Sequence, residues 1–116
     1  MGELETYQEL NRKLRQLDQC IRELRHTGGD YAEAERAYQI AKRKECLALK
    51  ADGMPVGLIS MICKGGDEVA SKNFDRMSKE AIYRANQEAV MSLKLQIRII
   101  NDQIARDYAN PSNGMG

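Results

Sequence analysis

The amino-acid sequence predicts an all-α fold. An antiparallel helical hairpin and a short helix would pack on a long C-terminal helix in a coiled-coil-like, dimeric arrangement. Apolar residues recur at three- and four-residue spacings along most of the chain, and glycines separate these periodic stretches. Aromatic residues make up only 5% of the 116 residues, and β-branched runs are few, which argues against a sheet protein.

The first predicted helix covers residues 4–26 and carries a heptad stripe of apolar side chains. The stripe consists of Tyr7, Leu10, Leu14, Leu17, Ile21 and Leu24. Gly28-Gly29 is expected to stop this helix, because glycine adopts the left-handed cap conformation without strain. A second helix would then run from a cap at Asp30 to about Asp52, and the short connection predicts an antiparallel hairpin.

The second predicted helix has an inner stripe of small residues, including Ala34, Ala37 and Ala41, which would let two helix axes approach closely. It also carries the basic run Lys42-Arg43-Lys44. Three successive positions spread around a helix, so we interpret the run as a solvated face rather than a phosphate site.

A short, very apolar helix is predicted from Val56 to Cys63. Gly53 ends the preceding helix, and Pro55 suits the first turn of the new one, where a missing amide costs nothing. Gly65-Gly66 is expected to stop it.

The long helix is predicted from Asp67 to Tyr108, a stretch without glycine or proline. At about 1.5 Å per residue it would span roughly 60 Å, of which the predicted hairpin covers only part. The second half keeps a heptad stripe, which we expect to form a seam with a second copy. The seam residues are Asn86, Val90, Leu93, Ile97, Ile100 and Ile104, and the polar Asn86 would fix the register.

The chain is expected to form one domain. We expect residues 1–109 to form a single helical domain and residues 110–116, which have turn-forming composition, to form a flexible tail.

Charge and hydropathy indicate where the protein is located. The net charge of +1 gives no overall attraction to nucleic acid or membrane, and no apolar run is long enough to span a bilayer. The acidic start lacks a signal-peptide pattern, and the three cysteines lack Cys-x-x-Cys spacing, so we expect a cytoplasmic protein with reduced thiols.

Templates for catalysis and metal binding are missing from the sequence. The single histidine, His26, suits a helix C-terminus, and the cysteines lack the spacing of zinc ligands. Gly65-Gly66 is not followed by the Lys-Ser or Lys-Thr of a phosphate-binding loop. We therefore expect no enzyme, no cofactor and no metal.

Residues 53–79 are similar to a helix-turn-helix: a turn, a short apolar helix, a glycine turn and a second helix. In that interpretation the start of the long helix would present Lys72, Arg76 and Lys79 to phosphates and Asn73 to a base edge. Nearby acids and the length of the helix count against it.

Three segments resemble those of small helical proteins encoded by phages and prophages of Gram-positive bacteria. They are Tyr-Ala-Glu-Ala-Glu at 31–35, Gly-Met-Pro-Val at 53–56 and Ala-Asn-Gln-Glu-Ala at 85–89. The group brings no catalytic residues to carry over. The resemblance implies a protein of the bacterial host cell that acts by binding: inhibiting a host defence nuclease such as a CRISPR effector, redirecting a host enzyme, or assisting DNA metabolism.

Two functions follow as hypotheses. The first is a non-catalytic protein-binding module, a homodimer that binds a host or phage protein. The more specific version of this hypothesis is an inhibitor of a host defence system. The alternative is a nucleic-acid-binding factor that uses residues 53–79.

Overall fold

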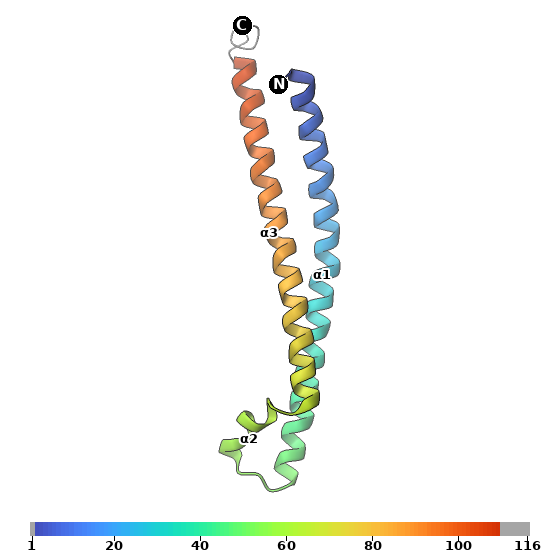
Figure 1. Ribbon diagram of the computed structural model, residues 1–116, viewed down its shortest axis with the longest axis vertical. Coiled ribbons are helices and arrows are strands. Elements are labelled where there is room, and N and C mark those ends of the chain that lie inside the picture. The colour runs from blue at the N-terminus through green and yellow to red at the C-terminus, as the bar shows by residue number, and fades with distance from the viewer. Residues whose placement is uncertain (1, 110–116) are drawn as a thin grey trace. The chain divides into compact units, whose positions relative to one another are not determined.

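The computed structural model describes residues 2–109, which form three α-helices (Figure 1). Helix α1 spans Glu3–Ala51, α2 spans Val56–Cys63 and α3 spans Asp67–Ala109. The predicted all-α class is therefore confirmed. Residues 110–116, for which the sequence predicts a flexible tail, lie outside the described residues.

The predicted hairpin of two separate helices, at residues 4–26 and 30–52, is wrong. Helix α1 runs without interruption through Gly28 and Gly29, and Asp30 lies inside it rather than capping a new helix. Neither glycine has a positive φ; within residues 2–109 only Gly53 does. A glycine inside a helix costs about 1 kcal/mol relative to alanine, a penalty that packing can offset.

Gly28 is a position where a side chain of α3 lies directly on the backbone of α1. A Cβ at Gly28 would stand only 3.1 Å from Cε1 of Tyr83. The Tyr83 ring also lies 6.0 Å, centroid to centroid, from the ring of Tyr31. A Cβ at Gly29 would meet no atom within 4 Å. Gly28 therefore makes room for Tyr83 instead of stopping the helix.

The other predicted boundaries agree with the structure. Gly53 follows α1 with a φ of 85°, in the left-handed region that glycine tolerates. Pro55 directly precedes α2, whose bounds are those expected. Helix α3 begins at Asp67, as predicted, and its last described residue is one beyond the predicted end at Tyr108.

Contacts divide the chain into two compact units. The terminal unit contains residues 2–24 and 85–109, and the central unit contains residues 25–84. In the terminal unit, the first part of α1 runs antiparallel to the last part of α3 (Figure 1), and Val90 and Leu93 are buried there.

The central unit contains all of α2 together with the second part of α1 and the first part of α3. Its buried residues are Ala34 and Ala41 from α1, Ile59 and Cys63 from α2, and Val69 from α3. Small residues of α1 therefore do line a core, as their spacing indicated, although the helices that meet there differ from the predicted pair.

Candidate interaction surfaces

In the terminal unit, the heptad stripe of α1 is only partly covered. Three of its residues, Leu10, Leu17 and Leu24, are half-buried. The other three, Tyr7, Leu14 and Ile21, are 38–44% exposed, and we call them the apolar edge. A regular pair of coiled helices buries both positions of a heptad stripe, so the exposure of one position here means that α3 covers mainly the other position.

The predicted seam residues of α3 fall into two groups. The Asn86 side-chain amide donates a hydrogen bond to the backbone oxygen of Cys20 over 3.2 Å, which joins α3 to α1 within one chain. Val90 and Leu93 are buried, and Ile97, Ile100 and Ile104 are half-buried. Part of the seam is thus used inside the chain. Its contact with a second copy stays a prediction.

A second apolar stripe lies on α3 and was missed by the sequence interpretation. Met91, Leu95 and Ile99 recur every four residues and are 56–69% exposed. Their spacing alone indicates a shared helix face, but the stronger heptad pattern of the neighbouring residues obscured it.

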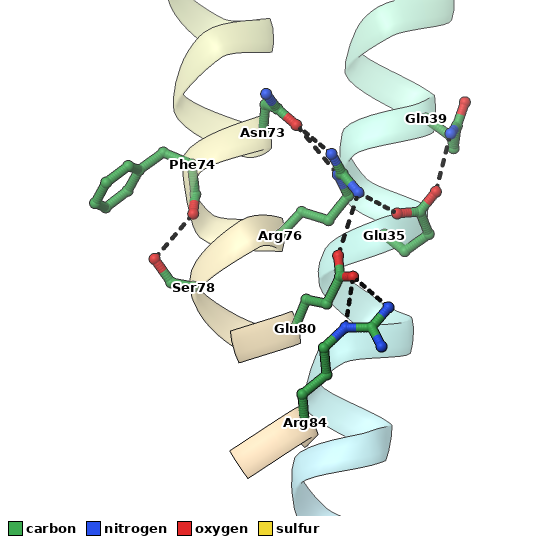
Figure 2. Close-up of polar contacts among 8 residues, drawn as sticks. All are labelled: Glu35, Gln39, Asn73, Phe74, Arg76, Ser78, Glu80 and Arg84. Carbon is green, nitrogen blue, oxygen red and sulfur yellow. Dashed lines mark hydrogen bonds and ion pairs between the residues drawn. The ribbon is translucent and has the colours of Figure 1, made fainter. Parts of the chain in front are cut away.

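In the central unit, Arg76 of α3 joins the two long helices (Figure 2). Its guanidinium lies 3.5 Å from a Glu35 carboxylate oxygen on α1 and 4.9 Å from the centre of the Tyr38 ring. Nε and Nη2 of Arg76 donate hydrogen bonds of 3.1 and 2.7 Å to the Asn73 side-chain oxygen. Arg76 also lies 3.7 Å from Glu80. This network fixes how α1 and α3 pair locally.

Glu80 links Arg76 to Arg84 along α3. The Arg84 guanidinium donates two hydrogen bonds to one Glu80 carboxylate oxygen, of 3.0 and 2.8 Å (Figure 2). These bonds are the main reason why the pKa of Glu80 is lowered below its ordinary value of 4.5. Glu80 therefore stays ionised, and the cluster keeps its ion pairs, at neutral pH.

The four candidate nucleic-acid contacts do not share one outward face. Lys72 is exposed, whereas Asn73, Arg76 and Lys79 are half-buried. Asn73, which was expected at a base edge, accepts a hydrogen bond from Arg76, which was expected to contact a phosphate. Arg76 also lies against α1. Nucleic-acid binding by residues 53–79 stays a prediction, with Lys72 as its best-placed residue.

All three cysteines are free thiols. Cys63 is fully buried, and its thiol donates to the Lys42 backbone oxygen over 3.6 Å, which attaches α2 to α1. Burial is the main reason why the pKa of the Cys63 thiol is raised above its ordinary value of 9.0, and the neighbouring Cys46 adds to the rise. Cys63 is therefore a packing residue.

One side of α1 in the central unit combines basic and apolar residues that are all exposed. We call it the outer basic face. It consists of Arg36, Ile40, Arg43, Lys44, Leu47 and Lys50. The predicted solvated run at 42–44 thus contributes only two of its residues, because Lys42 is half-buried beside the Tyr38 ring. The signal that identifies this face is the seven-residue spacing of Arg36, Arg43 and Lys50, and of Ile40 and Leu47.

Within residues 2–109, no group of three or more His, Cys, Asp or Glu side chains is arranged to hold a metal ion. Nor is any helix among the described residues both long and apolar enough to cross a bilayer. Comparison of this chain with protein-family models, with curated proteins and with solved structures finds no match.

Proposed function

We propose that this chain is a non-catalytic protein-binding module that works as a homodimer. The observation that carries the proposal is the apolar edge of the terminal unit, where Tyr7, Leu14 and Ile21 stay exposed although they belong to a regular heptad stripe. A heptad stripe with one set of positions half-exposed is what one half of a helical bundle presents.

A second copy of the terminal unit supplies the missing helices. Packing two such units together would create a four-helix arrangement and cover the apolar edge along with the exposed parts of Ile97, Ile100 and Ile104. Removing a large apolar side chain from water contributes about 1.5–3 kcal/mol when burial is complete, and less here because each is already partly covered. The contributions of six residues on each copy offset the cost of association.

Sedimentation equilibrium at about 50 µM tests the proposal, a concentration at which an interface of low-micromolar affinity is largely occupied. The full chain should sediment as a dimer, and Leu14→Glu should give monomers, because each copy would place a charge in the apolar interface. Leu95→Glu is the matched control. It changes an even more exposed apolar residue on the other stripe, and it should remain dimeric.

A monomeric full chain contradicts the proposed dimer. So does a dimer that Leu95→Glu dissociates while Leu14→Glu does not, because that result assigns the interface to the other stripe.

We propose, more narrowly, that the bound protein is an enzyme of bacterial defence, such as a CRISPR nuclease, and that binding inhibits it. What supports this narrower function is the resemblance of residues 31–35, 53–56 and 85–89 to small phage proteins. The test is DNA cleavage by a purified CRISPR nuclease with a stoichiometric amount of this protein. Cleavage should fall. Unchanged cleavage by nucleases of each type would remove the narrower function and leave the binding module.

A further inference from the structure

We propose that the outer basic face of α1 binds an acidic segment of a partner protein that carries apolar anchors. The inference rests on the proposed function of protein binding and deepens it by naming the chemistry of the partner. All six residues belong to the central unit, whereas the proposed dimer contact uses residues of the terminal unit. The two surfaces can therefore be tested separately.

The first argument is the concentration of positive charge. Residues 36–50 contain five basic residues and one acidic residue, an excess larger than the net charge of +1 of the whole chain. Arg36, Arg43, Lys44 and Lys50 are exposed, and none has a carboxylate within 4.0 Å among residues 2–109. By contrast, Arg12, Arg76 and Arg84 are each paired with a glutamate of the chain itself. The four cations of the face are available to an acidic partner.

The second argument is the alternation of charge with apolar surface. Ile40 is 51% exposed and Leu47 is 61% exposed, and each lies between basic residues along the same side of the helix. A phosphate backbone offers nothing for isoleucine and leucine to pack against. A peptide with both carboxylates and apolar side chains satisfies both kinds of group, as amphipathic segments do in helix-binding grooves.

The third argument is shape. A shallow hollow of about 530 Å³, open to solvent and lined by side chains of α1 alone, includes Ile40, Arg43, Lys44 and Leu47. Apolar side chains of a partner segment can pack against Ile40 and Leu47 there, while Arg43 and Lys44 reach its carboxylates.

The experiment uses the full chain and a fluorescein-labelled synthetic peptide that is rich in glutamate and has two leucines at seven-residue spacing. Fluorescence anisotropy should show saturable binding that weakens as salt is raised, because exposed charges are screened. Reversing two charges with Arg43→Glu and Lys44→Glu should weaken binding about ten-fold or more. Leu47→Ser should weaken it several-fold at unchanged charge.

The matched control reverses two exposed charges elsewhere, Lys72→Glu with Arg98→Glu, and should change the affinity less than about two-fold. A second peptide with serine in place of both leucines should bind clearly more weakly than the first. Circular dichroism of every variant verifies that the helices are intact.

The inference would be overturned by no saturable binding up to about 1 mM peptide, the weakest affinity of interest here; by an equal loss in the Lys72/Arg98 control; or by equal binding of the serine peptide. Tighter binding to a single-stranded oligonucleotide, or to vesicles containing phosphatidylserine, would also overturn it and assign the face to phosphate. Sedimentation of the same samples separates the two proposals. An unaltered chain that is dimeric but does not bind the peptide contradicts this inference alone, and an unaltered chain that binds the peptide as a monomer contradicts the dimer alone.

Discussion

Two adjacent glycines in the middle of α1 have different surroundings, although their residue type is the same. Tyr83 lies on Gly28, whereas the space next to Gly29 is open. Both pay the entropic cost of a helical glycine, but only Gly28 gains a close contact in return. The pair therefore permits a direct comparison of backbone entropy with packing.

We expect Gly29→Ala to raise the free energy of unfolding by about 0.5–1 kcal/mol, because alanine is the better helix former and the added methyl group meets nothing. Gly28→Ala should gain less or lose stability, because its Cβ would lie 3.1 Å from the Tyr83 ring. Urea unfolding of the two variants measures the difference. Equal stabilisation by both would show that Tyr83 does not rest on Gly28.

The buried thiol of Cys63 makes stability depend on alkaline pH. Its pKa in the folded protein lies above its ordinary value of 9.0, so the folded state keeps the proton where the unfolded state releases it. This contribution is fully present below pH 9.0 and is lost as the pH rises through the raised pKa. Cys63→Ala should lose less stability than the unaltered chain between pH 8 and pH 10 in urea unfolding. A parallel decline in both proteins would contradict the burial of the thiol.

At the scale of elements, the sequence identified most of the helix boundaries. The bounds of α2 and the start of α3 followed from Gly53, Pro55 and Asp67, whose local conformational preferences act on their own neighbours. The continuity of α1 could not be predicted in this way. A glycine such as Gly28 is suited both to the end of a helix and to a close contact with another helix. Which of the two occurs here depends on Tyr83, which is remote in sequence.

The pairing of α1 with α3 in the central unit should depend on Arg76. Arg76→Ala should lower the free energy of unfolding by about 1–2 kcal/mol, because it removes contacts with Tyr38, Glu35 and Asn73 at a half-buried site. Arg76→Lys should not restore the lost stability, because lysine lacks the planar guanidinium that hydrogen-bonds Asn73 while it stacks on the Tyr38 ring.

A double-mutant cycle with Glu35→Ala isolates the contact between the helices. The Arg76–Glu35 distance of 3.5 Å and the partial exposure of both side chains predict a coupling energy of about 0.5 kcal/mol. A full rescue by lysine, or no coupling with Glu35, would contradict the geometry of this network.

At the scale of the whole molecule, both proposed surfaces come from periodicities that place exposed residues on one side of a helix. The heptad of Tyr7, Leu14 and Ile21 was evident in the sequence, but its partial exposure required the structure. The outer basic face is difficult to identify from the sequence because the consecutive basic residues at 42–44 are the more obvious pattern. Arg36 and Lys50, one heptad to either side of Arg43, belong to the face but not to that run. Local spacing thus predicts which residues share a helix face but not which faces the fold leaves uncovered.

The central claim is that the exposed apolar edge is covered by a second copy of the chain, and the concentration dependence of thermal unfolding tests it most directly. For a folded dimer, raising the concentration from about 1 to about 100 µM adds about 2.7 kcal/mol of stability per dimer, which corresponds to a Tm higher by about 5 °C. The account predicts that rise for the unaltered chain and for Leu95→Glu, and a concentration-independent Tm for Leu14→Glu. A Tm of the unaltered chain that stays constant over this range would contradict the claim.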